Sequence, residues 1–350
     1  PQSDLQDQAY FRLAEYSYAS GEYPVAIENY RKVIDGWPES KLIPYCLYGA
    51  GWSFLRTEQL NDADAAFERL LTGFPDHDLA KQTRYARAMA RQQSGKFKES
   101  LSDIDLYLAS GPPRDGKSDA LYVKGLCQVG EKNYADAIGT FRSILQEDAK
   151  YSGADKVLYE LAWAYKSTDE PDQANAMFSR LAKNYPKSSL ASEAFYHVGE
   201  QFYDNQKYGS AAKAYEIAQK RVGDNSELGE KVRYKLGWSY YQLKKFPLAL
   251  RAFGDQVSSY ANGELAGDAY FMQGECNFQL KDFQQALAAY TDAKKRSVSS
   301  DTIGALMHLH AGQSAAQVGD WKQSLNWLQE IPKSYAESPY VPQTLFEIGT

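Results

Sequence analysis

A small residue recurs along this chain at a nearly constant interval, and this period restricts the fold more than any other feature. Glycine or alanine stands every 37 or 38 residues, and we call these positions the anchors. They are Ala14, Gly51, Ala88, Gly125, Ala162, Gly199, Gly237, Gly274, Gly312 and Gly349. A fixed period of this length is typical of a chain built from stacked structural repeats.

Two further columns follow the anchors at fixed distances. Twelve residues on lies a second small residue: Ala26, Ala63, Ser100, Ala137, Ala174, Ala211, Ala249, Ala286 or Ser324. Sixteen residues on lies a large one: Tyr30, Phe67, Ile104, Phe141, Phe178, Tyr215, Phe253, Tyr290 or Leu328. The pattern predicts two helices that approach closely at the small residues, with the large side chain filling the space beside them. One such hairpin cannot bury both of its faces, so neighbouring hairpins must stack.

The turns and linkers complete a pattern that resembles the tetratricopeptide repeat. The turns read "SGEY", "SGKF" and "NQKY", and a proline trails several units, as in "GWPES", "GFPDH" and "NYPKS". The resemblance covers residues 8–350 and implies an all-α, right-handed superhelical solenoid of nine full helix-turn-helix repeats plus the start of a tenth. We expect a single solenoid over residues 1–350, with repeats starting near residues 7, 44, 81, 118, 155, 192, 230, 267, 305 and 342.

The repeat length supports a narrower resemblance. A 37-residue period with "YPxS" linkers is similar to the tetratricopeptide proteins of bacterial outer-membrane assembly and of the Tol–Pal system. This resemblance implies a periplasmic or envelope location, with the cytoplasm as the alternative. The final "PQTLFEIGT" matches the opening of another first helix, so we expect the natural chain to continue beyond Thr350.

The composition of the chain and the spacing of its cysteines and histidines argue against several classes of function. The formal net charge of −6 disfavours nucleic acid as a partner, and no apolar run is long enough for a transmembrane segment. Cys46, Cys127 and Cys276 are odd in number and far apart, which predicts buried free thiols. The four histidines are too dispersed for a metal site. We expect no cofactor and no enzymatic activity, and we expect the carboxylates to lie on turns and solvated outer faces.

Two columns on the first helices are candidates for partner contact, because the first helices of the family line the concave side. The tyrosine column, three residues before each anchor, is Phe11, Tyr48, Tyr85, Tyr122, Tyr159, Tyr196, Tyr234, Phe271, Leu309 and Phe346. The variable column, one residue after each anchor, is Glu15, Trp52, Met89, Leu126, Trp163, Glu200, Trp238, Glu275 and Gln313. A purely structural column should repeat itself, so variation favours contact with a partner.

The predicted partner-binding residues combine the two columns, since tyrosine and tryptophan are enriched at binding hot spots. They are Tyr48, Trp52, Tyr85, Met89, Tyr122, Leu126, Tyr159, Trp163, Tyr196, Tyr234 and Trp238. The alternative is that these side chains only pack between repeats. The Lys and Asn with which some family members clamp a C-terminal carboxylate are absent from these positions.

The function that follows is a scaffold that binds a protein or peptide segment in an aromatic-lined groove and organises a bacterial envelope assembly. One alternative is a homo-oligomeric scaffold formed by self-association. Another is the substrate-recognition arm of a larger enzyme whose catalytic domain lies outside this segment. Carbohydrate stacking on the aromatic residues is a further alternative.

Overall fold

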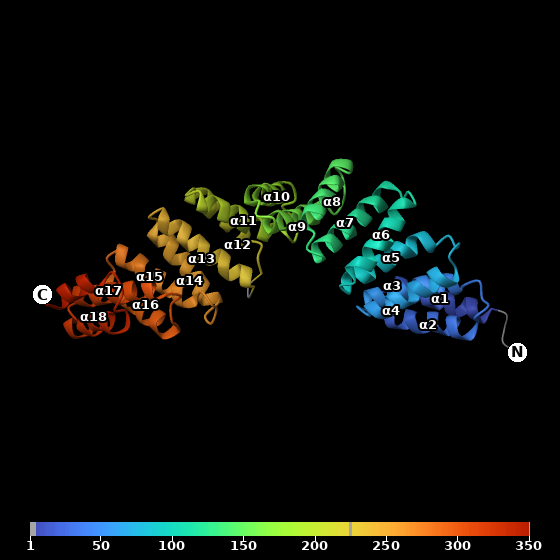
Figure 1. The fold of residues 1–350 in the computed structure, drawn as a ribbon. Helices are drawn as coiled ribbons and strands as arrows, with labels where there is room; N and C mark the ends of the chain where they lie inside the picture. The colour runs from blue at the N-terminus through green and yellow to red at the C-terminus, as the bar shows by residue number, and fades with distance from the viewer. Residues whose placement is uncertain (1–4, 224–225, 350) are drawn as a thin grey trace. The chain divides into compact units, whose positions relative to one another are not determined.

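The chain is all-helical throughout residues 5–223 and 226–349, which a computed structural model describes. Nineteen helices alternate with short turns and linkers in this part of the chain (Figure 1). Eighteen of them form nine consecutive hairpins, and α19 opens a tenth. The predicted all-α fold of nine helix-turn-helix repeats and the start of another is therefore confirmed.

The contacts divide the chain into two units, Pro1–Met177 and Phe178–Thr350, with the boundary inside α10 (Pro171–Asn184). The first unit holds α1 (Gln6–Ala19), α2 (Tyr23–Gly36), α3 (Ile43–Arg56), α4 (Leu60–Gly73), α5 (Ala80–Gln93), α6 (Phe97–Ala109), α7 (Arg114–Gly130), α8 (Tyr134–Glu147) and α9 (Ala154–Ser167). The second holds α11 (Ala191–Asp204), α12 (Tyr208–Gln219), α13 (Glu227–Gln242), α14 (Phe246–Ser259), α15 (Ala266–Gln279), α16 (Phe283–Arg296), α17 (Asp301–Gln317), α18 (Trp321–Ser334) and α19 (Val341–Gly349). A single solenoid over residues 1–350 stays a prediction.

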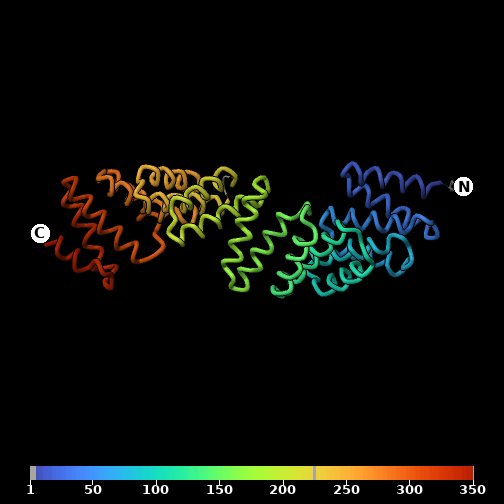
Figure 2. The backbone as a smooth tube through the Cα atoms, turned by 90° about the horizontal axis from the view of Figure 1, so that it is seen from above, coloured from blue at the N-terminus to red at the C-terminus, as the bar shows by residue number. Residues whose placement is uncertain are grey.

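Within each unit the hairpins stack into two layers (Figure 2). Each odd-numbered helix packs on the even-numbered helix that follows it, and that helix packs on the next odd-numbered one. Successive odd-numbered helices also contact each other, as α3 contacts α5 and α5 contacts α7. In the described part of the chain, successive even-numbered helices make no comparable contacts. The first helices of the repeats therefore lie closer together and form the inner layer of each unit.

Every hairpin turns at the same position. The residue seven places after the anchor has a positive φ, between 57° and 82°, in all nine repeats. These residues are Gly21, Glu58, Gly95, Lys132, Asp169, Gln206, Lys244, Lys281 and Gly319. The left-handed region favours glycine, yet six repeats carry another residue there. The packing of the two helices thus holds the turn in shape even where its residue does not prefer that shape.

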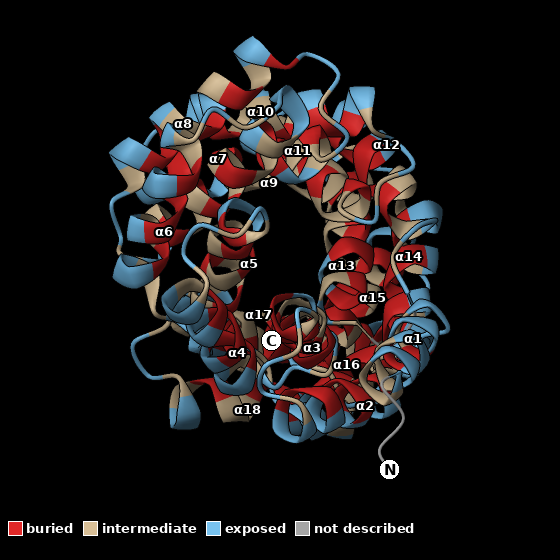
Figure 3. Cartoon of the chain, turned by 90° about the vertical axis from the view of Figure 1, so that its right-hand side faces the viewer, coloured by how far each residue is buried: buried red, intermediate tan, exposed pale blue. Residues whose placement is uncertain are grey.

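The anchors and the large column meet as the sequence predicts. A Cβ atom added at Gly51 would lie 2.3 Å from a ring carbon of Phe67, and one added at Gly125 would lie 2.3 Å from Phe141. A Cβ atom added at Gly199, Gly237 or Gly274 would lie 2.5, 2.6 or 2.3 Å from the ring sixteen residues on. The large side chains are fully buried in the first eight repeats and nearly so in the ninth, and Figure 3 marks buried residues in red.

Two further expectations concern the cysteines and the bilayer. Cys46, Cys127 and Cys276 are buried free thiols, as predicted. Among the described residues, the helices are all too short or too polar to cross a bilayer.

We predict that Gly125→Ala destabilises the first unit. The added methyl group would overlap the ring of Phe141, which is fully buried, so the ring or its helix must shift. The free energy of unfolding should fall by about 1–3 kcal/mol, measured by urea denaturation.

The matched control is Gly139→Ala, the same substitution on the neighbouring helix α8. A Cβ atom at Gly139 would contact nothing within 4 Å, and alanine favours a helix interior by up to about 1 kcal/mol. The control should therefore stabilise the unit. Equal effects at both positions would contradict the close contact at Gly125.

Candidate functional site

The tyrosine column packs inside its own repeat. Its rings lie at the separation of interacting aromatic pairs, about 4.5–7 Å between ring centroids, from the large residue of the second helix. The centroid distances are 6.3 Å for Tyr48–Phe67, 6.1 Å for Tyr122–Phe141, 5.9 Å for Tyr196–Tyr215 and 5.8 Å for Tyr234–Phe253. In the third repeat, which has Ile104 in the large column, Tyr85 instead lies 5.3 Å from Tyr107. The column therefore has a packing role in addition to any role in binding.

The first unit carries eight of the predicted partner-binding residues. They are Tyr48 and Trp52 on α3, Tyr85 and Met89 on α5, Tyr122 and Leu126 on α7, and Tyr159 and Trp163 on α9. We call these eight residues the aromatic strip. Seven of them are half-buried, and Trp163 is exposed, with 36% of its surface accessible. All eight lie on inner-layer helices and remain partly accessible after the hairpins have packed.

The structure brings the members of the strip together in pairs on the same helix. The rings of Tyr48 and Trp52 lie 6.2 Å apart, and those of Tyr159 and Trp163 lie 6.3 Å apart. The other three predicted residues, Tyr196 on α11 and Tyr234 and Trp238 on α13, belong to the second unit and are half-buried. They form a separate set, in which Tyr234 and Trp238 lie 6.3 Å apart.

The variable column follows a rule that the structure makes visible. Each glutamate of this column accepts a hydrogen bond from the buried tyrosine fifteen residues later. The pairs are Glu15 with Tyr30, Glu200 with Tyr215, and Glu275 with Tyr290, the last at 2.7 Å. A buried hydroxyl needs such a partner, so a tyrosine on the second helix requires an acceptor on the first.

The other six full repeats have neither the tyrosine in the large column nor the glutamate in the variable column. Where the second helix carries Phe, Ile or Leu, the variable column holds Trp, Met, Leu or Gln and never glutamate. An apolar ring offers no hydrogen bond, and a carboxylate beside it would lose hydration without compensation. Part of the variation in this column is therefore structural, which the sequence analysis did not foresee.

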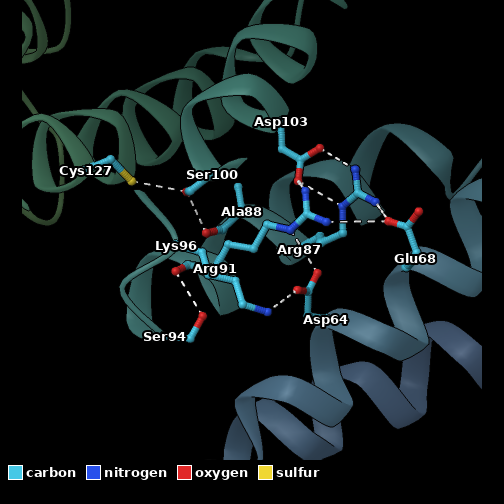
Figure 4. Close-up of polar contacts among 10 residues, drawn as sticks. All are labelled: Asp64, Glu68, Arg87, Ala88, Arg91, Ser94, Lys96, Ser100, Asp103 and Cys127. Atoms are coloured by element: carbon cyan, nitrogen blue, oxygen red, sulfur yellow. Dashed lines mark hydrogen bonds and ion pairs between the residues drawn. The ribbon is translucent and has the colours of Figure 1, made fainter. Parts of the chain in front are cut away.

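A partly buried ion network in the first unit joins Asp64, Glu68 and Asp103 to Arg87, Arg91 and Lys96 (Figure 4). The guanidinium group of Arg87 forms a fork with Asp103, with Nε–Oδ2 at 2.9 Å and Nη2–Oδ1 at 2.5 Å. Arg91 bridges Asp103 and Asp64, at 2.9 Å to each, and Lys96 reaches Asp64 at 2.8 Å. Burial disfavours the charge of Asp64, but Lys96 and Arg91 outweigh it and lower its pKa.

This network links α4, α5 and α6 and neutralises its own charges. Asp103 is 2% exposed and Asp64 is 9% exposed. The expectation that the carboxylates lie on solvated faces is wrong for Asp148, Glu230, Asp268 and Glu275, which are buried, and also for Asp64 and Asp103. For Asp64 and Asp103 the reason is that two arginines on α5 extend across the hairpin contacts to meet them. A network that is satisfied internally holds helices together and offers little charge to a ligand.

One carboxylate on the inner layer has no such partner, and the sequence analysis missed it. Glu160 on α9 is half-buried, and among the described residues it makes no hydrogen bond or ion pair. Burial is the sole cause of its raised pKa. The repeat alignment contains no signal for it, because the position two residues before the anchor holds basic, apolar and acidic residues in different repeats.

Metal binding finds no support in the described part of the chain, where no three His, Cys, Asp or Glu residues are grouped to hold an ion. His308 is buried and its Nδ1 lies 2.8 Å from the Gly304 carbonyl oxygen. The neighbouring His310 lies 2.7 Å from Glu275.

Comparison with sequence families returns one description, the tetratricopeptide repeat. Three models of this repeat match residues 8–40 and 45–77, residues 85–152 and 234–301, and residues 128–194. Together they cover well over half of the chain. No curated protein matches the sequence at a significant level.

Solved structures of repeat proteins resemble this chain. The C-terminal part of a TPR repeat-containing protein from Cytophaga hutchinsonii matches with a TM-score of 0.55 at 12% identity, over 75% of this chain and 99% of that one. A tetratricopeptide repeat protein from Parabacteroides merdae matches with a TM-score of 0.46 at 17% identity, over 87% and 99%. YrrB, described as a TPR protein with an unusual peptide-binding site, matches with 0.45 at 20%, over 55% and 91%. At 12% identity, the likeness to the Cytophaga protein is one of fold.

We predict that Tyr215 and Glu200 are energetically coupled. Tyr215→Phe and Glu200→Leu should each lower the free energy of unfolding by about 1–2 kcal/mol, since each removes one half of a partly buried hydrogen bond, and Glu200→Leu also removes the ion pair with Lys235. The double variant recreates the Leu126 and Phe141 combination of the fourth repeat. Its cost should be smaller than the sum of the single costs by about 1 kcal/mol. Additive costs in urea denaturation would contradict the pairing rule.

We also predict that alkaline pH unfolds the chain by ionising buried tyrosines. Burial raises the pKa of Tyr234 to about 12 and raises that of Tyr122 further. An unfolded tyrosine ionises near pH 10, so the unfolded state loses its protons first. Stability should be intact below about pH 10 and should fall as pH rises through the folded-state pKa values. Tyrosinate absorbance that develops fully before helix content is lost would contradict this.

Proposed function

We propose that this chain, which belongs to the tetratricopeptide repeat family, binds a segment of a partner protein along the aromatic strip of its first unit. The tetratricopeptide fold commonly mediates protein–protein interaction, and an architecture of such repeats alone is typically a non-catalytic scaffold. The proposal concerns where on this chain the partner binds and by which chemistry.

The exposure of Trp163 is the observation that carries the proposal. An indole is costly to leave in water, and this one is 36% exposed on an inner-layer helix. Its ring is approached by the Lys166 Nζ at 4.6 Å and by the ring of Tyr159. Exposed aromatic side chains beside other apolar residues are the usual anchors of a protein interface.

The shape of the strip favours a chain segment over a small molecule. Its eight residues are distributed in pairs over four successive inner-layer helices. Because such helices lie side by side, a ligand must be long enough to cross several of them, as a helix or an extended peptide is. The same crossing geometry provides the repeated, evenly spaced contacts that suit a polypeptide.

The 37-residue period supports an envelope assembly as the setting of this interaction. Trp238 and Tyr234 in the second unit extend the proposal to a second contact surface, because they repeat the Tyr–Trp pairing found on α3 and α9. Organising an assembly requires contact with more than one segment, and two such surfaces on one chain suit that task.

The test is selection of binders from a displayed library of random peptides. The parent chain should enrich a set of peptides, and Trp163→Ala should weaken their binding by about thirtyfold, which corresponds to the roughly 2 kcal/mol of a hot-spot residue. Affinities are measured by fluorescence anisotropy on peptides recovered from the selection.

The matched control is Tyr16→Ala on α1, which removes an aromatic ring of 71% exposure outside the strip. This variant should bind the selected peptides as the parent does. If the parent enriches no peptide, or if Trp163→Ala binds as tightly as the parent, the strip is not the binding site. Circular dichroism establishes that both variants are folded.

A further inference from the structure

We propose that a pocket beside the turns of the sixth and seventh repeats binds an acidic segment of a partner protein. The pocket has a volume of about 670 Å³ and lies in the second unit, between α12 and the turn that joins α13 to α14. We call it the turn pocket. It is separate from the aromatic strip, so this inference goes beyond the proposed function and does not depend on it.

The turn pocket is open because α12 carries small side chains at its start. Gly209, Ser210 and Ala212 line the pocket. Ala212 stands thirteen residues after its anchor, where the other eight full repeats carry Ile, Leu, Asp or Asn. A Cβ atom added at Gly209 would contact nothing within 4 Å. Larger side chains at these positions would fill the space that the pocket occupies.

Part of the lining is apolar. Tyr208, Leu243 and Leu248 line the pocket, and Leu248 has 43% of its surface accessible. Six residues after the anchor, where the seventh repeat has Leu243, the first six repeats carry Ser, Thr, Glu or Asn. A polar residue therefore suffices to build this turn, and the leucine presents apolar surface that a ligand side chain can cover.

The charge of the lining is mostly positive. Lys207, Lys213 and Lys245 are exposed at the pocket, and within the described chain their ammonium groups make no hydrogen bond or ion pair. The one carboxylate of the lining, that of Glu216, accepts a hydrogen bond from the Tyr240 hydroxyl. The pocket is therefore locally positive in a chain whose formal net charge is −6.

The junction of the second and third repeats shows what a lysine at this position binds. Lys96 stands eight residues after its anchor, as Lys245 does. Its Nζ lies 2.8 Å from Oδ2 of Asp64, which stands thirteen residues after the preceding anchor. Ala212 occupies that position in the sixth repeat. Lys245 therefore lies at a junction that lacks the matching carboxylate.

Other members of the two junctions correspond as well. Glu68 and Glu216 both stand seventeen residues after their anchors. Arg91 and Tyr240 both stand three residues after theirs. Arg91 binds both Asp64 and Glu68, whereas Tyr240 donates its hydrogen bond to Glu216. The earlier junction is thus neutralised by its own side chains, and the later one keeps a lysine without the aspartate.

An aspartate or glutamate side chain from a partner can take the place that Asp64 holds at the earlier junction. Its carboxylate would form a charge-assisted hydrogen bond with the Lys245 ammonium group, and the two neighbouring lysines would strengthen the attraction during approach. An apolar residue beside it would cover the two leucines. A segment that joins an acidic to an apolar residue therefore fits the turn pocket better than a nucleic-acid backbone, which would use only the charges.

The experiment is a selection from a displayed library of random peptides. The parent chain captures binders, and a counter-selection removes those that still bind Lys207→Gln/Lys213→Gln/Lys245→Gln. We expect the remaining peptides to carry aspartate or glutamate next to an apolar residue. In fluorescence anisotropy, the triple variant should bind them about thirtyfold more weakly than the parent. Raising the salt concentration to about 0.5 M should weaken their binding to the parent.

Two single variants test the pocket with its lysines in place. Ala212→Asp supplies on α12 the carboxylate that Asp64 supplies at the earlier junction. It should compete with the peptide for Lys245 and weaken binding by about tenfold. Gly209→Gln introduces the residue that the eighth repeat has at this position, Gln284, and should obstruct the pocket to a similar degree. Circular dichroism establishes that both are folded, and Gly209→Gln decides the matter if Ala212→Asp is not.

The matched control is Lys41→Gln/Lys81→Gln/Lys150→Gln. It removes three exposed lysines from the first unit and changes the net charge by the same amount. This variant should bind the selected peptides as the parent does. Trp163→Ala should also bind them as the parent does, because the aromatic strip takes no part in this contact.

The turn pocket is not a binding site if the counter-selection leaves no peptide, or if a folded pocket variant binds the peptides as tightly as the parent. Equal losses in Trp163→Ala or in the control triple variant would also overturn the proposal, since the effect would not be local. If the lysine variant instead loses binding to phosphatidylglycerol vesicles and no peptide depends on the lysines, the occupant is a lipid surface and the proposal fails. None of these results decides the role of the aromatic strip, which Trp163→Ala tests with its own peptides.

Discussion

The close approach of a small anchor to a large buried side chain is the contact on which the rest of the structure depends. In the second repeat the backbone of Gly51 lies so near the ring of Phe67 that even a methyl group would overlap it. This contact sets the distance between the two helices of a hairpin. It also holds the turn between them, which adopts a left-handed conformation even at Lys132. The stacking of successive hairpins depends on this distance between the two helices.

The second level of organisation is polar and is matched to the first. A tyrosine in the large column places its hydroxyl group in the core. A glutamate on the first helix accepts the hydrogen bond of that hydroxyl, as Glu275 does for Tyr290. That glutamate then reaches the next repeat through His310. Hydrogen bonds inside a hairpin and ion pairs between hairpins thus share the same carboxylate. A repeat without the tyrosine lacks this link, and its residue in the variable column can take another role.

The proposed binding surface consists of what this packing leaves over. Trp163 keeps part of its indole in solvent, and the other residues of the strip are half-buried. Trp163 lies on α9, and its column also carries Trp52 on α3 and Trp238 on α13. An interaction site on a solenoid is expected at positions that stay accessible after the hairpins have stacked.

Much of the fold was predictable from the sequence, because the spacing of the anchors can be read along the chain and every repeat packs its two helices in the same way. The tyrosine column and the strip could be named from spacing alone. The pairing of Glu200 with Tyr215 and the isolation of Glu160 could not, since both depend on which side chains meet across helices. The sequence by itself determined a stack of helical hairpins with a set of aromatic residues on the first helices. Only the tertiary structure decided which charges in that stack are satisfied, because satisfaction is a matter of distances between atoms that are far apart along the chain.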